Sequence, residues 1–321
     1  MRRPDVIKPV TILAAVLFAA TAAAAPSNRV FVTNERGDSV TVIDAATNQV
    51  VGTIDVGKRP RGIGIAPDGS EIYVALAAEN AIAVIDPVAM EVVRKFPSGD
   101  DPEAFAVNTN GYLYISNEDD AKASVYNPAD GSLVAEIKVG IEPEGVAASP
   151  DGSKVVVTSE STNMLHVISV PQHRIEANIL VGARPRSAAF SPDGKLIYAT
   201  SEISGEIKKI DAETYKILGV GTLGDERAKP KDVLVSLDGK KLYVAGGRAN
   251  SIAVLDADAL VVLKKIPVGE RVWGLAMNRD GSRLYTTDGV SHQTSVIDTA
   301  SEKVIATVAT GKFPWGVVVD D

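Results

Sequence analysis

Seven short segments carry a pair of charged or aromatic side chains on either side of one residue, which is proline in six of the seven. Proline fixes φ near about −65° and favours an extended conformation for the residue before it, so the two flanking side chains are expected to point the same way. The pairs are Arg59/Arg61, Asp101/Glu103, Glu142/Glu144, Arg184/Arg186, Lys229/Lys231, Arg271/Trp273 and Phe313/Trp315.

These side chains would bind a flat anion if the fold gathered them at one place. Arginine forks pair with carboxylates, and indole or guanidinium faces stack on aromatic rings. The alternative is that neighbouring pairs neutralise one another in solvated salt bridges worth ~0–1 kcal/mol each, while the tryptophans only fill a channel. The predicted ligand-binding residues are Arg59, Arg61, Arg184, Arg186, Lys231, Arg271, Trp273 and Trp315.

A second set of residues has the chemistry of a metal site. Glutamate recurs at the fifth position of stretches that resemble "FVTNE", preceded by asparagine or serine, and carboxylate, amide and hydroxyl oxygens suit hard cations such as Ca²⁺. The alternative is that each glutamate caps its own turn or pairs with an arginine of a neighbouring repeat. The predicted metal ligands are Glu35, Glu118, Glu160 and Glu202.

Internal repeats position both sets. Variants of "PDG" recur at Asp68, Asn110, Asp151, Asp193, Asp238 and Asp280, in steps of 42, 41, 42, 45 and 42 residues. Each repeat holds four short segments rich in β-branched residues and bounded by turn residues, which is typical of one blade of a β-propeller. The longer step comes from an insert at 223–232, which we expect to shape a pocket or a partner contact.

The repeats predict an all-β, seven-bladed propeller of four-stranded antiparallel blades. The segment "RVFVTN" near the N-terminus reads as a second strand, and "PWGVVVDD" at the C-terminus reads as a first strand with nothing after it. We therefore expect the C-terminal strand to complete the N-terminal blade, 29–57, and to close the ring without a free edge.

Composition and the N-terminus bound the class of protein. The formal charge of −8 argues against general nucleic-acid binding, and the absence of cysteine excludes disulfides and a covalent c-type haem. Residues 1–25 read as a signal peptide, with Arg2, Arg3 and Lys8 before an apolar run too short to span a bilayer. The sequence thus predicts a periplasmic protein, a single propeller domain at 26–321, and no membrane insertion after signal removal.

The stretch "FVTNERGDSVTVIDAATNQVVGTIDVGKRPRGIGIAPDG" resembles the YVTN β-propeller repeat family, with Phe31-Val32-Thr33-Asn34 in the place of the name-giving motif. Size, signal and "TNERGDSVTVID…VGKRPRGI" are similar, more narrowly, to propellers associated with catabolism that depends on pyrroloquinoline quinone (PQQ). That resemblance implies a non-catalytic accessory of PQQ-linked alcohol oxidation, with a periplasmic quinoprotein dehydrogenase or a transporter component as partner.

Three functional classes follow. The first is a non-catalytic propeller that binds a ligand such as PQQ, or a partner, on one face. The second is a carrier of a hard divalent or trivalent cation, Ca²⁺ or a lanthanide. The third, ranked last, is a quinoprotein-like or lactonase-like enzyme, because the sequence shows no Ser-His-Asp arrangement, nucleophile elbow or H-E-x-x-H motif.

Overall fold

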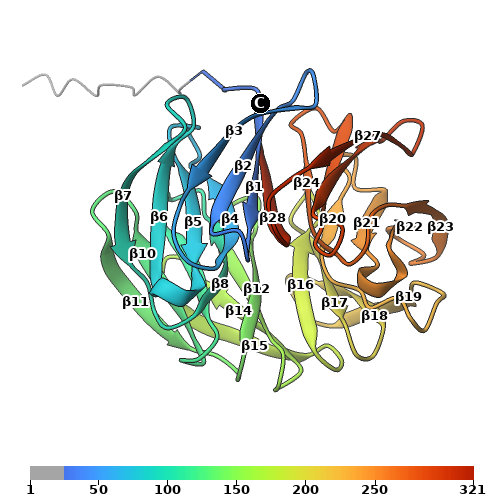
Figure 1. Cartoon of the computed structure of the whole chain (residues 1–321). Helices are drawn as coiled ribbons and strands as arrows, with labels where there is room; N and C mark the ends of the chain where they lie inside the picture. Colours follow the sequence, from blue (N-terminus) through green and yellow to red (C-terminus); the bar gives the residue numbers. More distant parts are fainter. Residues whose placement is uncertain (1–24) are drawn as a thin grey trace, which may run out of the picture.

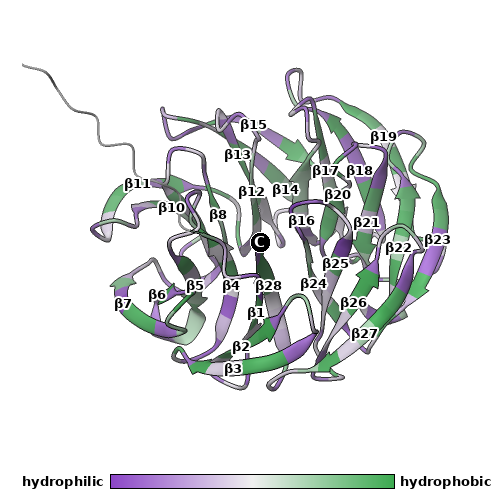
Figure 2. Ribbon diagram, turned by 90° about the horizontal axis from the view of Figure 1, so that it is seen from above, coloured by the Kyte–Doolittle hydropathy of each residue, from purple (hydrophilic) through white to green (hydrophobic). Residues whose placement is uncertain are grey.

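Strands of this chain form seven four-stranded antiparallel sheets around a central axis (Figures 1 and 2). The computed structural model describes residues 25–321, so residues 1–24 of the predicted signal peptide lie outside the described residues. The predicted fold class, seven blades of four strands, is confirmed. In the described part of the chain, no helix is both long and apolar enough to cross a membrane.

The ring closes as the sequence predicted. The C-terminal strand pairs with the first strand of the chain, with Arg29 opposite Asp320 and Val32 opposite Val317. We call this sheet blade 1 and number the others in chain order. Since blade 1 takes strands from both ends of the chain, no blade is left with an unpaired inner edge at the seam.

Each blade runs from an inner strand at the axis to an outer strand at the rim (Figure 2). The inner strands of blades 1 to 7 are β28 (Pro314–Asp320), β4 (Pro60–Ile65), β8 (Pro102–Val107), β12 (Pro143–Ala148), β16 (Pro185–Phe190), β20 (Val233–Val235) and β24 (Val272–Met277). The second strands are β1 (Arg29–Asn34), β5 (Ile72–Leu76), β9 (Leu113–Asn117), β13 (Lys154–Ser159), β17 (Leu196–Ser201), β21 (Lys241–Ala245) and β25 (Arg283–Asp288).

The third and outer strands complete the blades. The third strands are β2 (Ser39–Asp44), β6 (Ala81–Asp86), β10 (Lys122–Asn127), β14 (Met164–Ser169), β18 (Glu206–Asp211), β22 (Ser251–Asp256) and β26 (Gln293–Asp298). The outer strands are β3 (Gln49–Asp55), β7 (Glu91–Pro97), β11 (Ser132–Lys138), β15 (Arg174–Leu180), β19 (Ile217–Thr222), β23 (Val262–Pro267) and β27 (Lys303–Ala309). Two single-turn helices, η1 (Ala77–Glu79) and η2 (Gly247–Ala249), follow β5 and β21.

Apolar side chains between adjacent blades form the core. The second and third strands are buried almost throughout, and the outer strands alternate between exposed and half-buried residues. Between blades 5 and 6, for example, Tyr198 and Ile207 pack with Leu242 and Leu255. The core is therefore spread around the ring as a set of clusters between blades, which ties the position of every blade to its neighbours.

Hydroxyl groups of the second strands also join the blades. Thr33 Oγ1 donates a hydrogen bond to the carbonyl of Arg61 at 2.7 Å, and Thr287 Oγ1 donates to that of Trp315 at 2.8 Å. Thr33 is the threonine of the "FVTN" stretch, so this part of the motif connects one blade to the inner strand of the next. These two bonds hold the segments that carry the pairs Arg59/Arg61 and Phe313/Trp315, and we call each such segment before an inner strand a corner.

The corners before the inner strands differ from the expectation of an extended residue before proline. Arg59, Asp101, Glu142 and Arg184 have φ between 47° and 59°, and Arg271, which no proline follows, has φ of 60°. Positive φ costs a non-glycine residue roughly 1–2 kcal/mol. Hydrogen bonds to the backbone offset this cost: Asp38 Oδ1, for example, accepts a hydrogen bond from the N–H of Arg59 at 3.1 Å.

Candidate functional site

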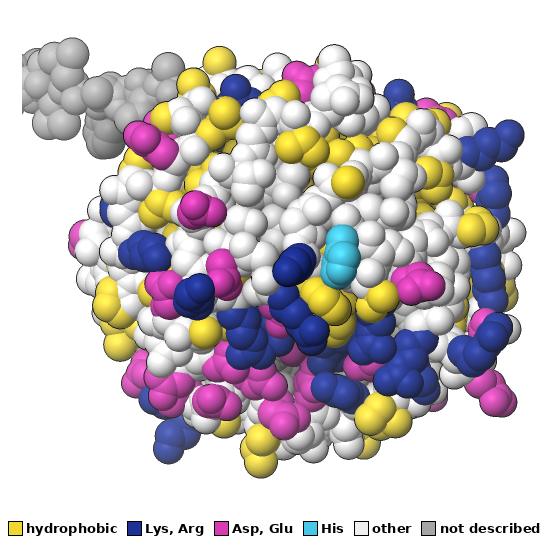
Figure 3. Space-filling view, in the orientation of Figure 1, with side chains coloured by type: hydrophobic (Ala, Val, Ile, Leu, Met, Phe, Trp, Pro, Cys, Tyr) yellow, Lys and Arg dark blue, Asp and Glu magenta, His cyan; other side chains and the backbone are white. Residues whose placement is uncertain are grey.

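The proline corners and the glutamate positions lie on the same face because a hydrogen bond joins them. In six of the seven blades, the residue after the second strand donates its N–H to the carbonyl of the first residue of a corner; in blade 6 the direction is reversed, and Lys229 N donates to the carbonyl of Gly246 at 3.4 Å. The pairs are Glu35 to Phe313, Ala77 to Arg59, Glu118 to Asp101, Glu160 to Glu142, Glu202 to Arg184 and Gly289 to Arg271, at 2.8–3.1 Å. Figure 3 shows basic and acidic side chains gathered together in the lower half of the molecule.

Two groups of charged residues occupy this face. We call the first the acidic cluster, from blades 1 to 3, and the second the basic cluster, from blades 4 to 7. The acidic cluster consists of Glu35, Asp101, Glu103 and Glu118 with Arg59 and Arg61. The basic cluster consists of Arg184, Arg186, Lys231 and Arg271 with Glu144, Glu160 and Glu202.

In the acidic cluster, two arginines hold four carboxylates. Arg59 Nη1 lies 2.9 Å from both oxygens of Asp101, and Arg61 Nη2 lies 3.0 Å from Glu35 Oε1. Arg61 also contacts Glu103, which has no exposed surface. Four negative and two positive charges leave this cluster at −2.

Glu118 is the carboxylate of this cluster with the weakest ion pair. Its Oε2 lies 3.9 Å from Arg61 Nη1. Burial raises the pKa of Glu118, and the negative charge of Glu144 in the next blade adds to the rise. The excess negative charge of the acidic cluster therefore falls on Glu118, where a cation would be stabilised.

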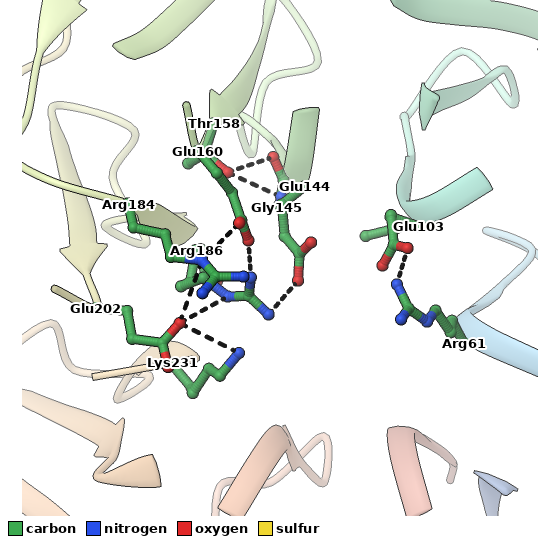
Figure 4. Close-up of polar contacts among 12 residues, drawn as sticks. Arg61, Glu103, Glu144, Gly145, Thr158, Glu160, Arg184, Arg186, Glu202 and Lys231 are labelled. Carbon is green, nitrogen blue, oxygen red and sulfur yellow. Dashed lines mark hydrogen bonds and ion pairs between the residues drawn. The ribbon is translucent and has the colours of Figure 1, made fainter. Parts of the chain in front are cut away.

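In the basic cluster, Arg186 lies among three carboxylates (Figure 4). Its Nη2 is 2.8 Å from Glu144 Oε1, it contacts Glu160, and its Nε is 3.7 Å from Glu202 Oε2. Arg184 Nε bonds Glu160 Oε2 at 2.6 Å. The ion pairs of Arg186 are buried rather than solvated, because Arg186 and the three glutamates are each less than 9% exposed.

Two cations of the basic cluster are not hydrogen-bonded by their side chains to any described residue. Lys231 Nζ lies 3.6 Å from Glu202 Oε2, beyond hydrogen-bond length, and 3.7 Å from the ring centroid of Trp273. The Arg271 guanidinium lies 5.1 Å from the same centroid. With Lys231 protonated, four positive and three negative charges give this cluster +1.

Burial and neighbouring charges shift the pKa values of Lys231, Arg271 and Glu202. Burial, reinforced by Arg186, holds the pKa of Lys231 well below its ordinary value, although Glu144 and Glu202 act the other way. Burial also lowers the pKa of Arg271. For Glu202, burial acts to raise the pKa, but the charges of Lys231 and Arg186 outweigh it and lower the pKa. The basic cluster is therefore short of negative charge at Lys231 and Arg271.

A cavity of about 180 Å³ lies at the axis beside the basic cluster. Its polar wall comes from Glu144, Arg186 and Lys231, and its aromatic wall from Trp273 and Trp315, the two tryptophans of the chain. Ser187, Asp232 and residues of the other inner strands line the rest. Of the eight predicted ligand-binding residues, the structure places Arg186, Lys231, Trp273 and Trp315 on this cavity.

The other four predicted ligand-binding residues lie around the cavity or in the acidic cluster. Arg271 stacks on Trp273, and Arg184 is paired with Glu160. Arg59 and Arg61 belong to the acidic cluster, and the Arg61 guanidinium lies 5.9 Å from the Trp315 ring centroid. The predicted set of eight is thus divided between two clusters.

The cavity lies at the axis where segments of all seven blades meet, and one of the inner strands is shorter than the others. Elsewhere the inner strands are so close that a Cβ on Gly145 would lie 2.4 Å from the carbonyl oxygen of Arg186, and one on Gly274 would lie 2.6 Å from that of Trp315. At the equivalent position of blade 6 stands Asp232, and β20 has three residues where the other inner strands have six or seven. The insert at 223–232 therefore ends at this short strand, and its last two residues, Lys231 and Asp232, line the cavity.

Asp232 bridges the resulting gap between blades. Its Oδ1 accepts hydrogen bonds from Ser187 Oγ of blade 5 at 2.7 Å and from its neighbour Val233 N at 2.9 Å, and its Oδ2 accepts one from Leu275 N of blade 7 at 2.9 Å. Burial raises the pKa of Asp232, while these bonds act to lower it. Sequence analysis missed this residue, although an aspartate at a position of small residues was a visible signal.

The four predicted metal ligands do not form one ligand set. Glu35 and Glu118 lie at Arg61, whereas Glu160 and Glu202 lie at Arg184 and Arg186. Within residues 25–321, the one group of three or more candidate ligands with atoms within 4.8 Å of one another is Asp101, Glu103 and Glu118. Asp101 and Glu103 were missed as candidates because they were assigned to the proline corners.

The two aromatic residues of the last corner, Phe313 and Trp315, face different surroundings. Trp315 faces the cavity, but Phe313 packs against His292, with ring centroids 4.9 Å apart, and beneath the Arg36 guanidinium at 3.9 Å. His292 Nδ1 accepts a hydrogen bond from the N–H of Phe313 at 3.1 Å. This gives His292 a structural role as a cap of the corner.

Fold and site together define a seven-bladed propeller with a charged, tryptophan-lined cavity on one face. Two family models match the chain: "YNCE-like beta-propeller" at residues 4–115 and "Lactonase, 7-bladed beta-propeller" at residues 142–304. Because the second match spans just over half of the 321 residues, the chain belongs to the seven-bladed lactonase β-propeller family.

Individual relatives are distant. Antigen Lp49 of Leptospira interrogans is 25% identical over 142 residues, and the match spans 42% of this chain and 31% of that protein. Kuenenia stuttgartiensis hydrazine synthase has a TM-score of 0.79 at 21% identity, over 86% of this chain and 93% of that one. A functionally unknown protein of Desulfotomaculum acetoxidans also reaches 0.79 at 16% identity, over 91% and 99%. The two structures share the fold alone.

Proposed function

We propose that this propeller binds a small, planar, anionic molecule in the cavity beside the basic cluster, and that it acts as a binding protein. The observation that carries the proposal is the pair of basic side chains, Lys231 and Arg271, that face Trp273 without a hydrogen bond to any described residue. Trp315 supplies a second aromatic wall. A carboxylate of the ligand would supply the missing negative charge, and the indoles would stack on its ring.

We further propose that the ligand is PQQ and that the protein is a periplasmic, non-catalytic accessory of PQQ-linked alcohol oxidation. PQQ is a flat tricarboxylate, so it combines the charge and the shape that this cavity favours. The proposed partners are a periplasmic quinoprotein dehydrogenase or a transporter component, as implied by the resemblance of "TNERGDSVTVID…VGKRPRGI" to that group of propellers.

Titration calorimetry with PQQ, together with intrinsic fluorescence, tests this proposal. Both tryptophans of the chain line the cavity, so their emission reports on the site itself. We expect micromolar binding that Trp273→Leu and Arg271→Gln weaken by at least about tenfold, the loss expected for a charged hydrogen bond of about 1.5–3 kcal/mol. Arg174→Gln is the matched control, because Arg174 is exposed on the outer strand β15 and belongs to neither cluster. No binding of PQQ at millimolar concentration removes the PQQ version.

A second candidate function is binding of a hard cation at Asp101, Glu103 and Glu118. Glu103 is fully buried, its Oε2 has no hydrogen-bond partner in the described chain, and the acidic cluster has a charge of −2. Calorimetric titration with Ca²⁺ and La³⁺ tests it. Saturable binding that Glu118→Gln weakens, while Glu136→Gln on the blade surface does not, supports the candidate; identical isotherms for all three proteins contradict it.

The family name makes lactone hydrolysis the alternative in the enzyme class. Turnover of aliphatic and aromatic lactones by the purified protein, abolished by Arg186→Met or Lys231→Met, would place it among enzymes. Ligand binding without turnover keeps it a binding protein.

A further inference from the structure

Lys231 has an unusual environment for a lysine. It is 4% exposed, it lines the axial cavity, and its Nζ lies over the face of Trp273 at 3.7 Å from the ring centroid. Within residues 25–321, no acceptor lies within hydrogen-bond distance of Nζ, since the nearest carboxylate oxygen, of Glu202, is 3.6 Å away. A buried amine that no acceptor holds is available to a molecule in the cavity.

The fold fixes this amine in place. Thr200 Oγ1 of blade 5 donates a hydrogen bond to the carbonyl of Lys231 at 2.5 Å, and Lys231 N donates to the carbonyl of Ala245 at 2.9 Å. The next residue, Asp232, is anchored to blades 5 and 7. Pro230 precedes Lys231 and limits the backbone further. The side chain therefore extends from a rigid support at the edge of the cavity.

Burial disfavours the ammonium form of Lys231, and the charges around it act in both directions. Arg186 and Arg271 act to lower the pKa of Lys231 and Glu144 and Glu202 to raise it, while burial is the largest influence and lowers the pKa. Desolvation and a neighbouring cation are the two conditions that turn a lysine into a nucleophile at neutral pH.

We propose that Lys231 forms a reversible imine with a carbonyl group of the bound ligand, which makes the ligand class an aromatic aldehyde, ketone or quinone that also carries a carboxylate. The inference rests on the proposed function, since it names the reactive group of the same ligand. The carboxylate pairs with Arg271, and the ring stacks on the indoles of Trp273 and Trp315, so the carbonyl carbon lies at Nζ.

The chemistry balances without a further reactant. The neutral amine of Lys231 attacks the carbonyl carbon, a C–N bond forms, and the π electrons of the C=O bond move to oxygen, which takes a proton. Loss of the hydroxyl as water then gives the C=N bond, so amine and carbonyl yield imine and water. Glu202, at 3.6 Å from Nζ, is placed to accept the proton that the nitrogen loses.

Reductive trapping tests the inference on the whole protein. The probe is 4-carboxybenzaldehyde with sodium cyanoborohydride, which adds hydride to the imine and leaves a stable secondary amine that peptide mass spectrometry locates. We expect Lys231 to be modified at least about tenfold faster than Lys229 at pH 7, because each pKa unit below ordinary gives tenfold more neutral amine. Lys229→Gln, two residues away, is the matched control, and Lys231→Gln removes the signal.

Terephthalate separates the two proposals. It has the shape and the carboxylate of the probe but no carbonyl that forms an imine. Terephthalate binding with no preference for Lys231 in trapping overturns the inference and leaves the proposed function intact. Absence of terephthalate binding with uniform labelling of surface lysines overturns both, and preferential labelling of Lys231 that excess terephthalate suppresses supports both.

Discussion

The acidic and basic clusters occupy the same positions of the repeat on the same face, yet they differ in what their charges leave unpaired. In blades 1 to 3, Arg59 and Arg61 are fully engaged, and the excess is a carboxylate at Glu118. In blades 4 to 7, the carboxylates are engaged, and the excess is a cation at Lys231 and Arg271. The face is therefore polarised, and the cavity lies on its basic side.

The difference follows from the match between one repeat and the next. A glutamate after the second strand contacts the corner of the following blade, so Glu35 meets Arg61 and Glu160 meets Arg184. Glu118 is followed by Glu144 and repels it, whereas Gly247 stands in the glutamate position before Arg271 and leaves that arginine without an ion pair in the described chain. Two mismatched junctions thus account for the excess charge at Glu118 and at Arg271.

The largest expected effect comes from removing the strand that joins the two clusters. Deletion of 312–321 removes β28, the inner strand of blade 1. It also removes Trp315, whose ring lies near Arg61 and whose carbonyl accepts the hydrogen bond of Thr287. It exposes the edge of β1 and should abolish soluble, cooperative folding. Thermal unfolding by circular dichroism checks this, and a truncated protein with an unchanged melting temperature would contradict ring closure.

Arg186→Met breaks the basic cluster at its centre. Glu144, Glu160 and Glu202 would stay buried without their main cation, so we expect a loss of about 3–5 kcal/mol in the free energy of unfolding. Urea denaturation at pH 7 measures it. Arg94→Met, at a half-exposed ion pair with Glu71, is the control and should cost less than about 1 kcal/mol. Equal losses for the two variants would mean that burial of the cluster has no energetic consequence.

Asp232→Ala opens the gap beside the cavity. The variant leaves the N–H of Leu275 and the hydroxyl of Ser187 without their acceptor, which should cost about 1–3 kcal/mol in urea denaturation. Asp232→Asn keeps the shape and one acceptor oxygen, so its loss should be smaller. If the alanine variant is as stable as the wild type, the bridge between blades 5 and 7 does not support the fold.

Glu118→Gln tests the acidic cluster, and here we expect no loss of stability at pH 7. Because the pKa of Glu118 is raised in the fold, the native state loses stability as the pH rises from the unfolded pKa, about 4.3, through the folded one. The glutamine variant lacks this loss, so at pH 7 it should equal the wild type or exceed it by less than about 1 kcal/mol. A clear destabilisation at pH 7 would show that the acidic cluster needs this charge.

Asp151 lies outside both clusters and serves as a reference. Its replacement should change the free energy of unfolding least. Hydrogen bonds from Ser149 Oγ and from the N–H and hydroxyl of Ser153 lower the pKa of Asp151 to about 2. Its stabilisation is present above the unfolded pKa of about 3.9 and is lost as the pH falls towards 2. Asp151→Asn should cost less than about 1 kcal/mol at pH 7 and nothing at pH 2, as read from melting temperatures at the two pH values.

Much of the site was predictable from the repeat, and part of it was not. The period placed the corners and the glutamates, so Arg186, Lys231, Trp273 and Trp315 were found as cavity residues before any coordinates. The sequence also left open, as the alternative to a metal site, that each glutamate pairs with an arginine of a neighbouring repeat, and Glu35 with Arg61 and Glu160 with Arg184 form such pairs. The positive φ of the corners was missed because proline statistics favour an extended predecessor.

The sequence alone determined seven blades, the order of their strands and the closure by the C-terminus, because a repeat of β-strands and tight turns specifies local structure many times over. Only the tertiary structure decided which charges meet. Ion pairing depends on distances between blades of a few ångströms, which vary around the ring where Asp232 replaces a small residue and β20 is short. The cavity is likewise a product of the tertiary structure, because residues from all seven blades meet around it at the axis.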